Sequence, residues 1–223
     1  ELKAQLEPAK TEISYLTKML RRGEAGEDVK KLQEFLKTDP EVYPESLVTG
    51  YFGPLTEKAV KKFNSLDILI NNAAVAKKEN FLETTEKDWD FMIDVNIKGV
   101  FICIQEFARL RQETNDKKQR EKLVINIASG AGIYGIEDIA VYSATKAAVI
   151  NIVQGLNEEL KSSGIKFIAV CPGSTNTKMF RNLFPEEKAR HTPEQVAEVI
   201  YKTIIGEIKP DDRLVVDVFY HTR

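Results

Sequence analysis

The sequence has few of the residues that build metal sites and disulfide frameworks. It contains two cysteines and two histidines. Cys103 and Cys171 each lie inside an apolar run, which predicts free buried thiols and no disulfide framework. Because only His191 and His221 stand beside them, and no cysteine pair has ligand spacing, we expect no metal site.

Long apolar runs and an excess of one charge are also absent. No stretch approaches the roughly 18 apolar residues of a membrane span, and no charged start followed by an apolar run predicts a signal peptide. Lys and Arg number 32 against 34 Asp and Glu, so there is no basic field to attract nucleic acid or anionic lipid. We therefore expect no nucleic-acid or membrane partner, and small molecules or carbohydrates instead.

The sequence changes character twice along its length. With 223 residues and 43% hydrophobic content, it suits one large domain or two small ones. Residues 1–19 have the pattern of a moderately amphipathic helix with Pro8 near its first turn, and we interpret them as a helical linker. Residues 20–64 predict a small all-α module, and residues 65–223 predict an α/β domain.

The all-α segment carries two apolar stripes at helical spacing. Asp28 is a candidate N-cap for the first helix, and the second begins near Pro54. RRGEAGEDVKKLQEFL and VTGYFGPLTEKAVKKF resemble the peptidoglycan-binding module, a three-helix cell-wall domain. The resemblance implies binding of cell-wall glycan. The alternative is that these residues are only the core and turn positions of a small helical domain.

From residue 65 onward, apolar runs alternate with amphipathic segments. Strands are predicted at LDILINNAA, KLVINIAS, IKFIAVCPG and RLVVDVFY, and helices over 88–112, 140–162 and 193–206. Strands separated by helices predict right-handed crossovers and a parallel sheet with helices on both faces.

Four polar side chains stand out in this α/β part. Tyr142 and Lys146, four apart in YSATK, share one helix face, where an ammonium lowers the pKa of a phenol and suits it to acid-base work. Such a pair alone is more often structural. Ser129 follows a strand in a Gly-rich loop, where parallel sheets place ligand-binding groups. Asn96 is an amide among apolar neighbours and needs hydrogen-bond partners.

In their order and spacing, these residues resemble the catalytic tetrad of the short-chain dehydrogenase/reductase family, over residues 66–223. NNAA at 71–74 stands where the family has NNAG, with Ala74 replacing the glycine. PGSTNT at 172–177 matches the loop that contacts the nicotinamide end of the cofactor. The resemblance implies an incomplete Rossmann-like doubly wound parallel sheet, preceded by the small all-α module.

The resemblance also implies a chemistry, which is hydride transfer between NAD or NADP and a carbonyl or alcohol. Tyr142 would move the proton, Lys146 would lower its pKa and hold the nicotinamide ribose, and Ser129 would polarise the carbonyl. Asn96 would hold a relay water, or would be a satisfied polar group at a helix irregularity. Residues 178–192 fall at the family's mobile lid, where Phe180, Leu183 and Phe184 line a pocket or simply pack. The implied cofactor-binding residues are Asn71, Asn72, Ala73, Tyr142, Lys146, Pro172, Gly173 and Thr177.

The family's opening half is missing from this sequence. Members begin with a strand, a TGxxxGxG turn that receives the pyrophosphate, and two more strands before NNAG. Here the module-like segment stands in that place, so we expect strand 66–71 to have an unpaired edge and cofactor affinity to be impaired. SLVTGYFGPLTEKAVKKF can also be interpreted as a minimal strand, turn and helix, although its glycine spacing does not fit the fingerprint.

Three functions remain open at this stage. The first is an NAD(P)-dependent oxidoreductase, cytoplasmic, and assembled through helices 88–112 and 140–162 as the family usually is. The second is a peptidoglycan-binding protein of the cell envelope with an inactive dehydrogenase-like passenger. Because these locations conflict, and because the chain begins at Glu1 without Met, the third is a chimera without joint function.

Overall fold

The computed structural model describes residues 66–113 and 121–222, with a few positions between 25 and 37. The chain divides into two units, Glu1–Leu66 and Asp67–Arg223. The predicted linker 1–19 and most of the module predicted over 20–64 lie outside the described residues. The second unit contains every strand of the predicted sheet.

Four parallel strands form one sheet in the order β1-β2-β3-β4. They are β1 (Ile68–Asn71), β2 (Lys122–Ile127), β3 (Ile165–Cys171) and β4 (Val215–Asp217). The predicted α/β fold with a parallel sheet is confirmed. The last strand is shorter than the predicted RLVVDVFY, because Asp217 accepts a hydrogen bond from the Phe219 backbone and caps a 3-10 turn at Val218–Tyr220.

Helices connect the strands and largely follow the predicted ranges. The long helix predicted over 88–112 is divided by a π-helical turn, Asp94–Lys98, into α4 (Glu86–Ile93) and α5 (Gly99–Glu113). After the long α6 (Ala140–Glu159), Gly164 takes a left-handed conformation that turns the chain into β3. Two further helices, α7 (Lys178–Leu183) and α8 (Pro193–Ile204), follow β3.

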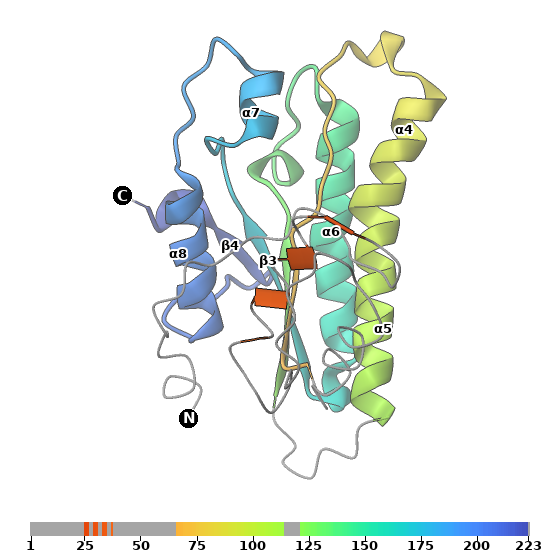
Figure 1. Cartoon of the computed structure of the whole chain (residues 1–223), viewed down its shortest axis with the longest axis vertical. Coiled ribbons are helices and arrows are strands. Elements are labelled where there is room, and N and C mark those ends of the chain that lie inside the picture. Colours follow the sequence, from red (N-terminus) through yellow and green to blue (C-terminus); the bar gives the residue numbers. More distant parts are fainter. Residues whose placement is uncertain are drawn as a thin grey trace. The chain divides into compact units, whose positions relative to one another are not determined.

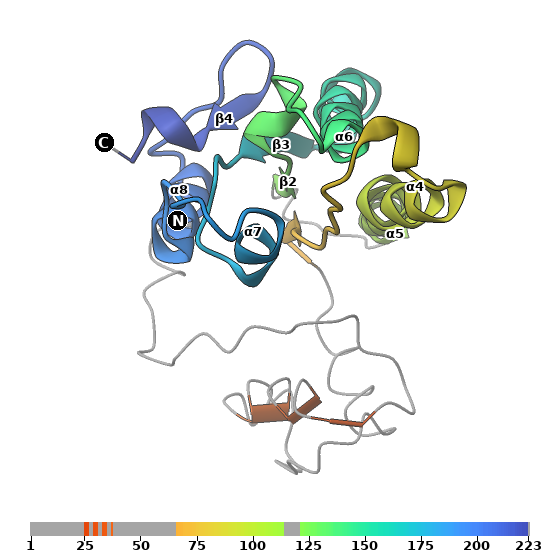
Figure 2. The same ribbon diagram turned by 90° about the horizontal axis from the view of Figure 1, so that it is seen from above.

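The sheet is covered on both faces (Figures 1 and 2). α5 and α6 lie on one face, and α8 lies on the other. β3 shows why its sequence is apolar from Phe167 onward: Phe167 and Ala169 pack toward α5 and α6, whereas Ile168 and Val170 pack toward α8. The part of a strand that is buried on both faces needs apolar residues at successive positions.

The loops that follow β1, β2 and β3 meet at the carboxyl edge of the sheet. Ala128 donates its backbone N–H to Val170 O at 2.8 Å, and Gly130 donates to Pro172 O at 2.8 Å. These two bonds continue the strand pairing into the loops, so the residues after β2 and β3 are held side by side. Parallel sheets place ligand sites at this edge.

No helix within residues 66–113 and 121–222 is both long and apolar enough to span a bilayer.

Candidate active site

Ser129 stands at the carboxyl edge of β2 in extended backbone. It caps the short turn Gly130–Gly132, and its Oγ accepts a hydrogen bond from the Ala131 backbone at 3.1 Å. Its side chain also lies close enough to the Tyr142 hydroxyl to lower the pKa of that phenol. The turn therefore holds the Ser129 hydroxyl at the end of the sheet and against the first turn of α6.

Gly132 allows this turn to pack directly on α6. A Cβ added to Gly132 would lie 2.6 Å from the backbone carbon of Lys146 and 2.8 Å from its oxygen. Both distances are shorter than any side chain tolerates against backbone. The close approach brings the Ser129 turn against the part of α6 that carries Tyr142 and Lys146, a contact that the sequence analysis did not predict.

Lys146 is a buried ammonium directed at the carboxyl end of β2. Its Nζ donates to Ile127 O at 2.7 Å and lies 5.8 Å from the centroid of the Tyr142 ring. Only 3% of the residue is exposed. The structure thus brings together three of the four predicted catalytic side chains: Ser129, Tyr142 and Lys146.

Burial controls the ionisation of this group. Desolvation raises the pKa of Tyr142, and the hydrogen bond from Ser129 opposes that shift. Desolvation lowers the pKa of Lys146 to about 8. The prediction that the Lys146 ammonium lowers the pKa of the Tyr142 phenol is wrong here, because the Tyr142 pKa is raised. The 5.8 Å separation leaves desolvation as the larger effect on Tyr142.

Cys171 lies beneath the same group at the end of β3. Its side chain is fully buried, and desolvation raises the pKa of its thiol to about 12 despite a hydrogen bond from the Ser129 backbone. The prediction of a free buried thiol is therefore confirmed for Cys171. It is wrong in part for Cys103, whose thiol is free and only half-buried.

Asn96 does not touch the other three residues. It lies in the π-helical turn, where its Nδ2 donates to Val75 O at 2.8 Å and to Thr145 Oγ1 at 3.0 Å. Its Oδ1 accepts from the Val75 backbone N–H at 2.8 Å. The amide therefore fixes the loop after β1 against α6. These contacts are those expected of a satisfied polar group at a helix irregularity, and the relay water stays a prediction.

The loop after β1 presents backbone and small side chains at the edge of the sheet. Asn71 is half-buried and donates from Nδ2 to Asn126 Oδ1 at 2.8 Å, whereas Asn72 and Ala73 are exposed. Asn126, fully buried in β2, was not predicted as a site residue. Its amide orients Asn71, and its Nδ2 is a buried donor without a partner in the structure.

The loop after β3 is held by the segment that precedes α8. Pro172 accepts from Gly130, Gly173 is exposed, and Thr177 caps α7 by accepting from the Phe180 backbone at 3.3 Å. The predicted cofactor residues Pro172, Gly173 and Thr177 therefore lie along the same carboxyl edge as Ser129.

The predicted lid segment contacts the loop after β1. Phe180 and Phe184 stack with centroids 5.4 Å apart, and the ammonium of Lys78 lies 4.7 Å from the Phe184 ring. This cation-π contact joins the loop after β1 to the segment after α7. Phe180, Leu183 and Phe184 are all half-buried.

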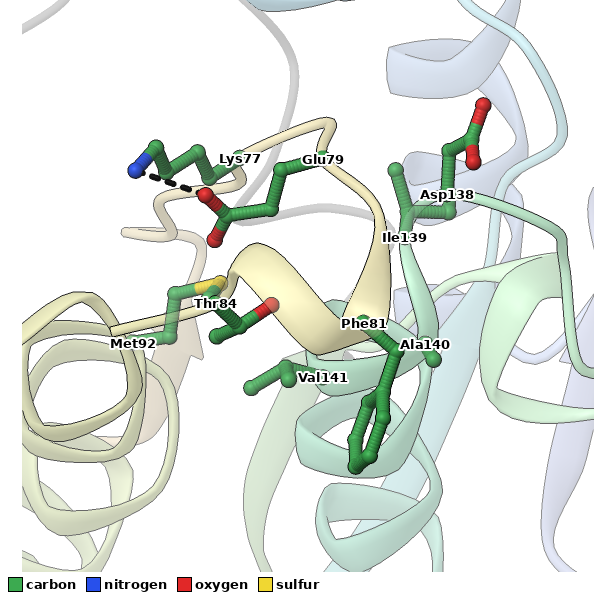
Figure 3. A pocket seen from close by; sticks show the side chains of 9 residues that line it. All are labelled: Lys77, Glu79, Phe81, Thr84, Met92, Asp138, Ile139, Ala140 and Val141. Carbon is green, nitrogen blue, oxygen red and sulfur yellow. Dashed lines mark ion pairs between the residues drawn. The ribbon is translucent and has the colours of Figure 1, made fainter. Parts of the chain in front are cut away.

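A small pocket lies beside the first turn of α6 (Figure 3). Residues of the loop after β1 form one wall, with an ion pair of 2.7 Å between Lys77 and Glu79, and Ile139, Ala140 and Val141 form another. None of Ser129, Tyr142 and Lys146 lines it. The pocket is thus adjacent to the catalytic candidates and separate from them.

Comparisons with known proteins agree with this geometry. Residues 52–188 match the family described as short chain dehydrogenase. The match begins inside the predicted module 20–64, so residues 52–64 belong to the matched segment as well.

Two curated relatives and one solved structure illustrate the likeness. The 3-oxoacyl-[acyl-carrier-protein] reductase FabG of Thermotoga maritima is 36% identical over 158 residues, which is 66% of this chain and 61% of that protein. The 3-oxoacyl-[acyl-carrier-protein] reductase of Synechocystis sp. is 37% identical over 139 residues, with 62% of this chain and 54% of that protein covered. The chain thus spans about three fifths or less of these relatives' lengths.

The solved structure is the 3-ketoacyl-(acyl-carrier-protein) reductase from Brucella melitensis complexed with NADH. It superposes with a TM-score of 0.61 at 27% identity and covers 74% of this chain and 70% of that one. The residues 52–188 that match the family model include β1, β2, β3 and the three converging side chains. The chain belongs to the short-chain dehydrogenase family.

Proposed function

We propose that this protein is an NAD(P)-dependent oxidoreductase that transfers hydride between a nicotinamide and a carbonyl or alcohol. One observation carries the proposal, namely the convergence of Ser129, Tyr142 and Lys146 at the carboxyl edge of a parallel sheet. The turn after β2 supplies one hydroxyl, and α6 supplies the other hydroxyl and the ammonium. Together they are the donors that a reacting carbonyl oxygen requires.

The residues present fit the nicotinamide end of such a cofactor. The buried ammonium of Lys146 is a donor for ribose hydroxyls, and the exposed backbone of Asn72, Ala73 and Gly173 leaves room for a flat ring. When bound, the cofactor supplies or accepts the hydride.

The chain's own residues handle the proton. Burial keeps the Tyr142 phenol protonated at neutral pH, so in the reducing direction Tyr142 donates its proton to the substrate oxygen. Ser129 donates a second hydrogen bond to that oxygen. The Lys146 ammonium then stabilises the developing phenolate, since opposite charges close together favour the charged form.

The relatives suggest a first substrate. Both curated relatives are reductases of 3-oxoacyl-[acyl-carrier-protein], and the half-buried Phe180, Leu183 and Phe184 offer apolar contacts near the site. We therefore propose a 3-oxoacyl thioester as the first carbonyl compound to be assayed with this chain.

Cofactor titration tests the proposal most directly. We expect NADH or NADPH to raise the melting temperature of the full chain, because a ligand that binds only the folded state stabilises it. Energy transfer from Trp89, the single tryptophan, to the reduced nicotinamide gives an independent signal. If neither signal changes up to millimolar NADH and NADPH, autonomous oxidoreductase activity is ruled out.

The pH dependence of turnover should report the Lys146 ammonium. Its pKa of about 8 means that the charge is present below pH 8 and lost above it, so kcat/KM for reduction should fall as the pH rises through 8. In Lys146→Arg, the guanidinium stays charged, so kcat/KM should show no such fall below about pH 10. If kcat/KM of Lys146→Arg still falls near pH 8, the fall belongs to another group.

We also propose that copies of the chain assemble through α4, α5 and α6. Large apolar side chains are exposed on the first two of these helices: Trp89, Phe91, Phe101 and Ile102. α6 exposes small residues, including Ala147 and Gly155. Exposed apolar groups beside small residues allow helices of two subunits to approach closely.

The described residues carry no support for glycan binding, so that function remains a sequence prediction.

A further inference from the structure

His191 is a buried imidazole with no part in the proton chemistry proposed above. It is 3% exposed and stands just before the Thr192 cap of α8. Its Nδ1 lies 3.0 Å from Thr222 Oγ1, and that hydroxyl also donates to Val218 O at 3.2 Å. Because the hydroxyl has one hydrogen, the consistent tautomer has Nδ1–H donating to Thr222, which leaves a lone pair on Nε2.

The free side of the ring faces the loop after β3. A Cβ added to Gly173 would lie 3.3 Å from His191 Nε2, and Nε2 is buried without a hydrogen-bond partner in the structure. The imidazole thus lies directly against Gly173, and Gly173 is at the same time exposed to solvent. The ring separates this loop from the C-terminal segment that contains Thr222.

The backbone of His191 holds the same loop. His191 N–H donates to Ser174 O at 3.0 Å, and Asn176 N–H donates to His191 O at 2.9 Å. The neighbouring Arg190 donates its N–H to Ser174 Oγ at 3.0 Å. Burial, and then the charge of Arg190, lower the pKa of His191, with Asp217 opposing the shift. The ring is therefore neutral at neutral pH.

We infer that His191 is a positioning residue for the Pro172–Thr177 loop, which would hold the nicotinamide end of the cofactor, and that Thr222 fixes the imidazole against Gly173. The inference rests on the proposed function, since it assigns that loop to the cofactor. A neutral ring suits the position, because a protonated Nε2 would place a charge and an N–H against the Gly173 backbone without an acceptor.

The test is a double-mutant cycle of His191→Ala and Thr222→Val in the full chain. We expect His191→Ala to weaken NADH binding about tenfold, with a larger change in the cofactor KM than in kcat, because the lost support acts on the loop. Thr222→Val should have a smaller effect of the same sign. The double variant should equal His191→Ala, since both changes act through one ring.

The matched control is His221→Ala. His221 is the other histidine of the chain, it is exposed, and it precedes Thr222 in the same segment. We expect this variant to keep the parent's NADH affinity. Backbone amide resonances of Gly173, Ser174 and Asn176, recorded without cofactor, should shift in His191→Ala and Thr222→Val and stay in place in His221→Ala.

Several outcomes overturn the inference. Additive effects of the two substitutions would mean that the residues act independently, and unshifted loop resonances in both variants would mean that the ring does not hold the loop. If His191→Ala fails to fold, the test rests on Thr222→Val. Loop resonances and NADH affinity equal to the parent's in Thr222→Val would then refute the positioning role of His191. A parent that does not bind NADH overturns the proposed function, while the loop resonances still decide whether His191 positions the loop.

Discussion

Tyr142→Phe lowers the kcat of carbonyl reduction by about 10²–10⁴-fold, the usual contribution of a positioned general acid. The change removes the hydroxyl that would donate to the substrate oxygen and keeps the ring, whose centroid lies 5.8 Å from Lys146 Nζ. Because the phenol is protonated at neutral pH, the parent can donate the phenolic proton to the substrate oxygen. The variant has no hydroxyl and cannot. Steady-state assays with NADPH or NADH and a 3-oxoacyl thioester measure the difference.

Two measurements separate lost chemistry from lost structure in this variant. Urea unfolding should give nearly the parental free energy, because the change removes one hydroxyl and keeps the apolar ring. Tyr134→Phe is the matched control, since Tyr134 lies in the loop before α6 and is 67% exposed; it should retain full turnover. A Tyr142→Phe protein that reduces the substrate as fast as its parent would refute the role of the hydroxyl.

The fold was predictable because its signals are local and repeated. β3 is apolar from Phe167 to Cys171 and therefore predicts a strand covered on both faces. The spacing of Tyr142 and Lys146 predicts that both lie on one helix face. The π-helical turn at Asp94–Lys98 was not predictable as such, although a buried amide in an apolar helix indicated an irregularity at Asn96. Its partners, Val75 and Thr145, are distant in sequence and leave no pattern of their own.

The ionisation of the site could not be predicted from residue types. The spacing in YSATK correctly places an ammonium near a phenol, but a distance of 5.8 Å and the burial of both groups decide which effect prevails. Desolvation depends on every element packed around the site, including Cys171 from β3. A local motif contains none of this information.

The close packing of Gly132 on α6 was not predicted, for a related reason. In SGAGIYG, three glycines look alike, and a Gly-rich loop gives no indication of which glycine the fold requires. Only the three-dimensional contact with the Lys146 backbone distinguishes Gly132 from Gly135, around which a Cβ would find nothing within 4 Å. The distinction matters because the turn at Gly132 also carries Ser129.

Gly132→Ala is therefore expected to damage both stability and turnover. The new methyl group would overlap the backbone of α6, which cannot yield as a flexible side chain would, so the turn must move away. We expect a loss of about 1–3 kcal/mol in the free energy of unfolding, the typical cost of overpacking. Moving Ser129 away from Tyr142 by about an ångström should also lower kcat by about 10²-fold.

Gly135→Ala provides the comparison within the same loop. It adds the same methyl group at an exposed position with open space around it, so urea unfolding and kcat should both stay close to parental values. If Gly132→Ala behaves like Gly135→Ala in both measurements, the turn is free to move without cost, and the packing of Gly132 on α6 does not hold Ser129 against Tyr142. If only Gly132→Ala loses stability and turnover together, the close approach of turn and helix is what aligns the two hydroxyls.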